Sequence, residues 1–409
     1  EKIFMHLTVH EEKRYKMYIV KKKNTYIHWW GKIIVLISND EYYKLNDLET
    51  YLVQKIMRNN NSINVINSIS NELEVDTCEA EEFVSIFLNN YDSIFEYKKQ
   101  NKAMNISGEK GKYFPFELHI SLTNMCNQQC IHCDKKAGEA NEKIDYNELL
   151  NFLKYMEGKV PFLTLSGGDA LMYPYIENIL NIFGNTYQIC VMTSGFDIKD
   201  SQVDALKKAR RGVYMSVYSS KPEIHDKFVG VKNSYKKIID NIEKLCSKKI
   251  HVGVSTLLTE TNSDDIIELV SILDKMGINR ISLGLISNIG RAKEKGLSAK
   301  DKDKVIDNMK KIKEQFDDIV VLQEVEENKR KRIFSPFKCM AGSLLWCLYE
   351  NGEIYPCGVC KEKNLLMGSV NNYEECIDNI TSYYERISKL LIIKKLESLE
   401  DVCPFMEET

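Results

Sequence analysis

Three features are missing from this 409-residue sequence, and each absence argues against a class of protein. There is no surplus of basic residues: 56 Lys and Arg against 59 Asp and Glu give a net charge of −3, so we expect no nucleic-acid partner. There is no long apolar run, because runs such as Ile33–Ile37 and Leu390–Ile393 are too short to cross a bilayer. No charged-then-apolar leader opens the chain. We therefore expect a cytoplasmic protein without a membrane partner.

Cysteine, by contrast, is abundant, with twelve residues. A disulfide scaffold would be small and secreted, and a chain of this length is not small. Metal ligation, catalytic thiols and ordinary burial remain, and position distinguishes them. Three cysteines lie within eight residues, and six lie between Cys339 and Cys403. We expect structural roles for Cys78, Cys190, Cys246 and Cys376.

The chain divides into three blocks and a polar linker. We predict an α+β domain over 1–98, a linker over 99–112, a strand–helix domain over 113–316 and a cysteine-rich domain over 317–409. The first block favours strands over 26–37, around Gly31-Lys32, and then three helices. The third of these helices begins at Asp76, with Glu79 completing a capping box. The last block ends in a helix-like tail over 381–399.

The central block alternates strands with helices. Strands are predicted over 116–122, 162–165, 188–193, 213–218, 251–257 and 280–286, and helices over 146–156, 175–182, 201–209, 235–245 and 264–276. Six strands joined by crossovers imply a parallel sheet, either a partial (β/α)6 barrel or a doubly wound sheet. In both architectures the functional groups gather at the C-terminal ends of the strands.

A cysteine triplet follows the first strand of this block. Cys126, Cys130 and Cys133 have the spacing CxxxCxxC on one short loop. Three thiolates can hold three irons of a cubane cluster and leave the fourth iron open for a ligand. The alternative is zinc, which normally takes four closed ligands, and no fourth His or Cys lies at a zinc-finger spacing.

From Phe116 to Arg291 the chain resembles the radical S-adenosylmethionine (SAM) superfamily. The resemblance implies a [4Fe–4S] cluster on the triplet, SAM on its open iron, and an external electron donor of the flavodoxin or ferredoxin type. It places His132, before the third cysteine, near the adenine. It implies further SAM contacts from residues at the ends of the next strands, namely Gly167, Gly168, Asp169, Thr193, Ser194 and Ser216.

Some positions depart from the family pattern or have two interpretations. Asp169 stands where the family has Glu, and Ser194 where it has Asn. Ser216 is either a SAM contact or a hydroxyl of the barrel interior. We favour a loop-structuring role for His225 and Asp226 over acid–base chemistry, because hydrogen abstraction by a radical needs none. Gly290-Arg291-Ala292 also follows the family, without an assignable function.

The late cysteines resemble the SPASM or twitch auxiliary-cluster domain. A hairpin with a type I′ turn at Asn351-Gly352 is predicted to bring Cys339 and Cys357 together as ligands of one auxiliary Fe–S cluster. Cys360 and Cys403 are the next candidate ligands. Cys347 is a core thiol or, like Cys376, a hydrogen donor if the reaction is an epimerisation.

The first block resembles the PqqD-like domain that precedes many maturases of ribosomally made peptides. A small sheet with an open edge can add the leader of a precursor peptide as a strand. The alternatives are a winged-helix-like domain without a partner, or a DNA-binding domain, against which the lack of a basic recognition helix argues. The implied activity is peptide crosslinking, by a thioether or C–C bond, in preference to epimerisation. A radical SAM enzyme acting on a small molecule or folded protein, and a cluster-bearing sensor, are the other hypotheses.

Overall fold

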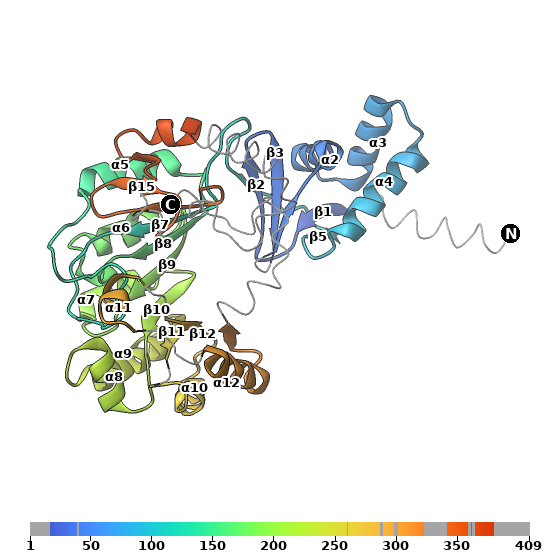
Figure 1. Cartoon of the computed structure of the whole chain (residues 1–409). Helices are drawn as coiled ribbons and strands as arrows, with labels where there is room; N and C mark the ends of the chain where they lie inside the picture. Colours follow the sequence, from blue (N-terminus) through green and yellow to red (C-terminus); the bar gives the residue numbers. More distant parts are fainter. Residues whose placement is uncertain are drawn as a thin grey trace, which may run out of the picture.

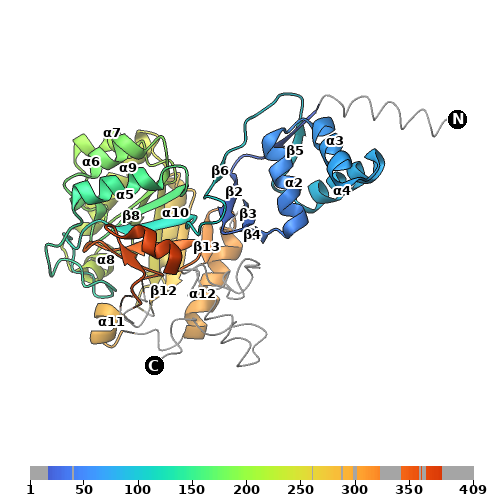
Figure 2. The same ribbon diagram turned by 90° about the horizontal axis from the view of Figure 1, so that it is seen from above.

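The computed structural model describes residues 17–38, 41–259, 261–286, 289–297, 302–322, 342–358, 361 and 365–379. An N-terminal unit of short strands and three helices stands beside a larger strand–helix unit, as Figures 1 and 2 show. Strands from the last part of the chain return to the larger unit (Figure 1). The predicted tail helix over 381–399 lies outside the described residues. None of the described helices is long and apolar enough to cross a membrane.

The N-terminal unit contains two small sheets. A four-stranded sheet has the order β4-β3-β2-β6, and β1 pairs antiparallel with β5. The hairpin predicted around Gly31-Lys32 is present as β2 and β3. The strands are β1 (Tyr18–Lys21), β2 (Thr25–Trp30), β3 (Ile33–Ser38), β4 (Glu41–Lys44), β5 (Phe95–Lys98) and β6 (Ile106–Ser107).

Three helices cover this unit, as the apolar spacing predicts. They are α2 (Asp47–Arg58), α3 (Ser62–Leu73) and α4 (Thr77–Asn90). The capping box of Asp76 and Glu79 is confirmed: the Glu79 amide donates to the Asp76 side chain, and the Asp76 amide donates to Glu79. Asn46 and Glu49 form the same box on α2.

The segment predicted as a linker belongs partly to the N-terminal sheet. Within it, β6 pairs parallel with β2. The buried His28 ring holds this arrangement, since its Nδ1 lies 2.9 Å from Ser107 Oγ and its Nε2 lies 2.9 Å from the Phe114 carbonyl. The segment has the polar composition of a free linker, and its pairing could not be predicted from the sequence because Ser107 meets its partner, Ile27, 80 residues away.

The larger unit is a partial barrel. Seven parallel strands are neighbours in chain order, which excludes the doubly wound alternative because such a sheet reverses its strand order. The predicted partial barrel is thus confirmed, and a seventh strand, from the block predicted over 317–409, joins its six. The strands are β7 (Glu117–Ser121), β8 (Phe162–Ser166), β9 (Gln188–Thr193), β10 (Gly212–Ser216), β11 (Val252–Leu258), β12 (Ile281–Leu285) and β13 (Val320–Leu322).

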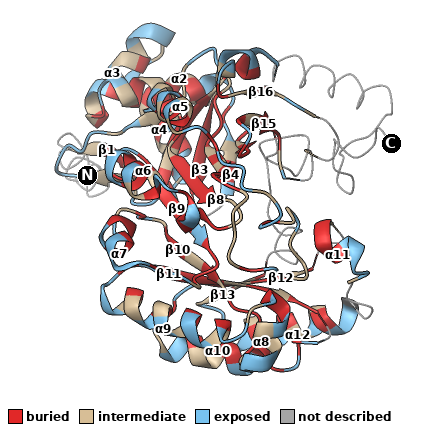
Figure 3. Ribbon diagram, turned by 90° about the vertical axis from the view of Figure 1, so that its left-hand side faces the viewer, coloured by how far each residue is buried: buried red, intermediate tan, exposed pale blue. Residues whose placement is uncertain are grey.

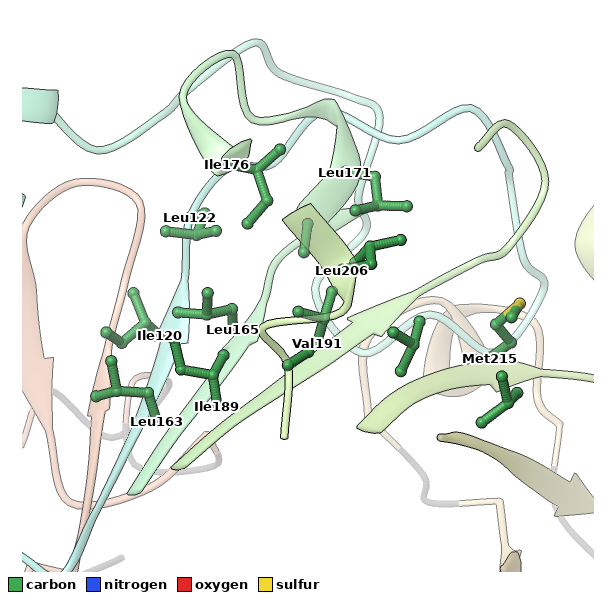
Figure 4. Close-up of a cluster of buried hydrophobic side chains, with 14 of the residues drawn as sticks. Ile120, Leu122, Leu163, Leu165, Leu171, Ile176, Ile189, Val191, Leu206 and Met215 are labelled. Carbon is green, nitrogen blue, oxygen red and sulfur yellow. The ribbon is translucent and has the colours of Figure 1, made fainter. Parts of the chain in front are cut away.

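Helices cover the outer face of these strands, and Figure 3 shows their buried sides turned toward the sheet. They are α5 (Tyr146–Met156), the 3-10 helix η1 (Ala170–Met172), α6 (Ile176–Phe183), α7 (Asp200–Leu206), α8 (Pro222–Val229), α9 (Ser234–Ser247), α10 (Ile266–Lys275) and α12 (Lys302–Gln315). The short helix α11 (Gly290–Glu294) lies instead against the loop after β7. Alternation along the strands builds the core. Leu163 and Leu165 on β8 pack with Ile189 and Val191 on β9 (Figure 4), while the intervening residues face the interior of the barrel.

The late hairpin extends the same sheet, which the sequence did not predict. β14 (Leu345–Leu348) pairs parallel with β7, and β15 (Glu353–Tyr355) and β16 (Gly368–Ser369) continue outward from it. The first strand of the barrel therefore lies between β8 and the auxiliary hairpin. Fully buried Trp346 anchors β14 in the main core.

The turn of this hairpin corrects the prediction of a type I′ turn. That turn needs positive φ at both central residues, but only Gly352 of the pair has it, at +82°. The Gly352 amide donates to the Tyr349 carbonyl at 2.9 Å, so the loop has three residues with glycine in the left-handed position. Asn351 instead uses its side-chain oxygen to accept from the Glu353 amide at 3.1 Å.

Candidate active site

The cysteine triplet lies in a cavity at the C-terminal ends of the barrel strands. Cys126, Cys130 and Cys133 are each half-buried on the loop after β7, and all three line a cavity of about 370 Å³. That volume is within the usual range for a small-molecule site. Its other lining residues are His119, Gln128, His132, Asp134, Lys135, Ala137, Ser166, Gly167, Gly168, Met192, Thr193, Ser194, Tyr214, Ser216, Tyr218, Ser255, Leu257, Ile289 and Arg291.

The three thiols fit a cluster better than a single ion. In the part of the chain that the structure describes, no three His, Cys, Asp or Glu side chains stand close enough to hold one metal ion. A cubane binds each thiolate to a different iron, so its ligands lie further apart than those of one ion. Burial raises the pKa of Cys126 to about 11 and also raises the pKa of Cys130. Binding iron therefore displaces protons from these thiols.

The Gly-Gly pair after β8 lies directly against the cysteine loop. The Gly168 amide donates to the Thr123 carbonyl at 2.6 Å, and the Asp169 amide donates to the Met125 carbonyl at 2.9 Å. A Cβ atom on Gly167 would stand 2.4 Å from the Thr123 carbonyl oxygen, and one on Gly168 would stand 2.4 Å from that of Met125. Both positions must therefore be glycine for the two loops to approach.

His132 also lines this cavity and carries a buried ring nitrogen without a hydrogen-bond partner among the described residues. Its ring packs against Tyr218, at 4.7 Å between centroids, and against Phe228, at 5.2 Å. Burial lowers its pKa to about 4, so the ring is neutral. Among the described residues nothing hydrogen-bonds to its buried Nδ1. An orphaned ring nitrogen beside three thiols and a glycine cradle is what a bound nucleoside group would complete.

Asp169, which was predicted to contact SAM, is not among the residues that line the cavity. Its carboxylate is 2% exposed and accepts hydrogen bonds from Thr193 Oγ1 at 2.6 Å, from Ser194 Oγ at 2.5 Å and from the Ser194 amide at 3.1 Å. It also accepts from the Leu171 amide at 2.9 Å. The carboxylate thus ties the end of β9 to the loop after β8. Its contact with the amino group of SAM stays a prediction.

Sequence reasoning identified Ser216 on the cavity wall but missed other polar residues of the barrel interior. His119, Tyr214 and Ser255 also line the cavity. Burial lowers the pKa of His119 to about 4, so it contributes a neutral ring. The signal that could have found them is the period of two along each strand: His119 lies between the core residues Leu118 and Ile120.

His225 and Asp226 organise the loop between β10 and α9, as we favoured. The buried His225 Nδ1 accepts from the Tyr218 amide at 3.2 Å, and its Nε2 lies 3.3 Å from Ser234 Oγ. The Asp226 carboxylate accepts from the amides of Asn233, at 2.6 Å, and Tyr235, at 2.9 Å. Neither residue lines the cavity.

Only some of the late cysteines can be placed. Cys357 packs against a cluster of Cys347, Tyr349 and Tyr355. Cys339, Cys360 and Cys403 lie outside the described residues, so their cluster-ligand roles stay predictions. Burial raises the pKa of both Cys347 and Cys376 to about 12, and Cys376 belongs to the main hydrophobic core. Neither of these two thiols lines the cavity, and the hydrogen-donor role stays a prediction.

The sequence of this chain is similar to a known superfamily and to two proteins of Bacillus subtilis. Residues 120–272 match the sequence profile of the Radical SAM superfamily. The chain is 23% identical over 262 residues to the sporulation killing factor maturation protein SkfB of Bacillus subtilis, covering 63% of this chain and 63% of that protein. It is 23% identical over 302 residues to the antilisterial bacteriocin subtilosin biosynthesis protein AlbA of the same species, covering 71% and 66%. The chain thus spans slightly less than two thirds of the length of these relatives.

Solved structures resemble the chain over most of its length. SuiB of Streptococcus suis bound to S-adenosylmethionine superposes with a TM-score of 0.62 at 15% identity, over 89% of this chain and 88% of SuiB. SuiB bound to the precursor peptide SuiA superposes with a TM-score of 0.61 at 17% identity, over 85% and 84%. At such identities the likeness establishes the fold.

Proposed function

We propose that this chain, which contains a radical SAM domain, is an enzyme that modifies a ribosomally synthesised precursor peptide. The observation that carries the proposal is that three cysteines, the Gly167-Gly168 pair and His132, whose buried Nδ1 has no hydrogen-bond partner among the described residues, line one cavity. A [4Fe–4S] cluster on the three cysteines supplies one-electron reduction of SAM, and hence a 5′-deoxyadenosyl radical that abstracts hydrogen from the substrate.

The residues of the protein itself hold the reactants in place. Gly167 and Gly168 let the loop after β8 pack directly against the backbone of the cysteine loop, and Asp169 fixes Thr193 and Ser194 beside them. The uncharged polar residues of the lumen, which include His119, offer hydrogen bonds to a peptide, while Asp134, Lys135 and Arg291 also line the cavity. Reducing equivalents come from an external flavodoxin or ferredoxin in this proposal.

A peptide substrate is supported by the relatives and by the N-terminal unit. SkfB is named for the maturation of a sporulation killing factor, AlbA is named for the biosynthesis of the bacteriocin subtilosin, and SuiB has been solved with a precursor peptide. We favour formation of a thioether or C–C crosslink over epimerisation, because the predicted auxiliary cluster can accept the electron left after ring closure. The hydrogen donor that epimerisation needs would have to reach the cavity, and Cys347 and Cys376 do not line it.

A basic groove beside β1 and β5 is the place where we expect the leader to dock. The groove has a volume of about 630 Å³. Five lysines and a single carboxylate give it a strong positive charge in a chain whose net charge is −3. An acidic stretch of leader paired with the open edge of β5 would neutralise this charge. The groove is lined by Val20, Lys21, Lys23, Glu96, Lys98, Lys99, Gln100, Asn101 and Lys102.

Co-expression with a short precursor encoded beside the gene, followed by mass spectrometry, tests the activity. We expect the core peptide to lose two hydrogens for each crosslink, and to remain unmodified with a Cys126→Ala/Cys130→Ala/Cys133→Ala variant. An unchanged mass with a D-residue after hydrolysis would indicate epimerisation instead. If no neighbouring peptide binds or changes, the peptide proposal fails, and small-molecule chemistry such as that of the GTP 3′,8-cyclase of Clostridium perfringens, 25% identical over 205 residues, becomes the alternative.

Charge reversal tests the docking groove. Lys99→Glu/Lys102→Glu should weaken binding of the leader peptide at least tenfold in fluorescence anisotropy, and raising the salt concentration should weaken the wild-type complex. Lys248→Glu/Lys249→Glu, on an exposed turn of the barrel unit, is the matched control and should bind normally. Equal binding by both variants would mean that the leader binds at another site.

A further inference from the structure

Arg291 contacts the cysteine loop from the opposite side of the barrel. It lies on α11, the short helix after β12, and is 8% exposed. Its guanidinium donates to the Ala137 carbonyl at 2.5 Å and to the Cys130 carbonyl at 3.3 Å, and its Nε lies 3.1 Å from a Glu139 oxygen. Its backbone amide donates to the Cys133 carbonyl at 2.9 Å. One residue thus holds the carbonyls of two proposed cluster ligands.

The preceding glycine permits this approach. Gly290 has φ of +53°, and a Cβ atom there would stand 2.3 Å from the Asp134 carbonyl oxygen and 2.4 Å from that of Cys133. The start of α11 therefore lies directly against the loop backbone. This contact joins residues that are about 160 positions apart in the chain.

Other segments also hold the loop, but mainly through backbone groups. Gln129 and Ile131 donate their amides to Val229 and Phe228 at the end of α8, each at 2.9 Å. Those contacts form with any side chain. The contacts of Arg291 need a planar fork with several donors, which lysine cannot reproduce. The identity of residue 291 is therefore tied to the conformation of the cysteine loop.

We propose that Arg291 is a positioning residue: it fixes the loop that carries Cys126, Cys130 and Cys133 and places a permanent positive charge beside the bound cluster. The inference rests on the proposed function in so far as the loop carries a cluster. A cubane with three thiolates is anionic when reduced, and a fixed cation close to it favours the reduced state. Outer contacts of this kind typically change metal affinity or activity by about 10–100-fold.

The test compares Arg291→Gln and Arg291→Lys with wild type in the full chain. In the metal-free protein, hydrogen exchange of the amides between residues 126 and 138 should be about tenfold faster in both variants. After anaerobic reconstitution with iron and sulfide, both should lose the cluster to a chelator about tenfold faster. Arg291→Gln should shift the reduction potential of the cluster downward and alter its electron paramagnetic resonance signal, whereas Arg291→Lys, which keeps the charge, should largely restore the potential.

A matched control lies on the same helix. Glu294 forms an exposed ion pair with Lys136 of the same loop, without touching the carbonyls. Glu294→Gln should leave exchange, cluster retention and potential unchanged. Wild-type exchange and cluster retention in Arg291→Gln would overturn the inference while leaving the proposed function intact. If wild type itself binds no cluster, the proposed function fails, and exchange in the metal-free protein still decides whether Arg291 holds the loop.

Discussion

At the scale of single residues, Asp169 shows how a shortened side chain takes on a structural task. Its carboxylate accepts four hydrogen bonds, three from the end of β9 and one from η1 after β8, and the residue has almost no exposed surface. Ser194, which replaces the family's Asn, supplies two of those four donors. The two departures from the family pattern are therefore partners in one hydrogen-bond network.

Replacing Asp169 should destabilise the metal-free protein. Asp169→Ala leaves three buried donors without an acceptor, while Ser194 Oγ can still donate to Asn127 Oδ1 at 3.2 Å. We expect the free energy of unfolding to fall by about 3 kcal/mol. Asp169→Asn, which keeps the shape and one oxygen, should cost less. Urea denaturation of the metal-free protein measures both. If Asp169→Ala unfolds like wild type and yet fails to bind SAM in calorimetry, the carboxylate is a ligand contact and not an organiser.

His28 is a second residue whose environment has a measurable consequence. Burial lowers its pKa to about 4, whereas an unfolded chain has an ordinary value near 6.5. The unfolded state therefore takes up a proton at a higher pH than the folded state. The stability contributed by the neutral ring is complete above about pH 6.5 and is lost as the pH falls toward 4.

We expect acid to destabilise the wild type more than a His28→Gln variant, whose amide can still donate and accept. At pH 5 the titration of His28 should cost the wild type about 2 kcal/mol relative to pH 7.5, and the variant should lack this part of the loss. Denaturation curves of both proteins at the two pH values give the difference. Burial also lowers the pKa of His119, His132 and His225 to about 4. These three residues are present in both proteins, so their contribution to the acid destabilisation cancels in the difference. Parallel losses in the two proteins would show that His28 does not titrate in this way.

At the scale of elements, the auxiliary hairpin is stabilised at both of its ends. At the turn, Gly352 adopts the left-handed conformation, and the Glu350 carboxylate accepts from Ser121 Oγ at 2.7 Å, which ties the turn to the end of β7. Along the strand, Trp346 is buried in the barrel core. The hairpin is therefore part of the barrel sheet rather than a separate appendage.

Gly352→Ala should loosen this hairpin. A positive φ costs an L-residue about 1–2 kcal/mol, and the added Cβ would also stand 3.1 Å from Val370 Cγ2. We expect faster hydrogen exchange over 345–355 and a lower unfolding midpoint. Gly352→Asn is the control, since asparagine tolerates this conformation better and should lose less. If alanine and asparagine behave alike, the conformation of residue 352 does not limit the stability of the hairpin.

At the scale of the whole molecule, aromatic rings join the N-terminal unit to the base of the barrel. The Tyr26 ring lies 4.8 Å from that of Phe162 and 5.5 Å from that of Phe116, both in edge-to-face geometry. The same cluster includes buried Val35, Ile37 and Tyr42 from the N-terminal sheet. A leader held on the N-terminal unit would thus be presented from a platform anchored on the barrel.

Tyr26→Ala should uncouple the two units without unfolding either. We expect the free energy that holds the two units together to fall by about 3 kcal/mol. Two separate thermal transitions should then replace one. Trypsin should also cut faster at the lysines of the 99–112 segment. Tyr26→Phe keeps the ring and should behave like wild type. A single transition and wild-type proteolysis for Tyr26→Ala would mean that other contacts hold the units together.

Local features of the chain could be predicted because they depend on near neighbours. The period of two or 3.6 residues identifies the barrel strands and helices, and α5 and β9 begin and end where predicted. The CxxxCxxC loop and the Gly-Gly pair are likewise readable, because their chemistry lies within a few residues. These features determined the fold class and the candidate cluster site.

Contacts between distant segments were decided by the tertiary structure alone. Periodicity does not encode which strand edge β14 joins, nor that Arg291 holds a loop about 160 residues before it. The direction of the Asp169 carboxylate depends on donors that β9 brings to it. The sequence by itself therefore determined the class of chemistry, while the packing of distant segments decided which side chains hold the cysteine loop, because such contacts exist only once the sheet has formed.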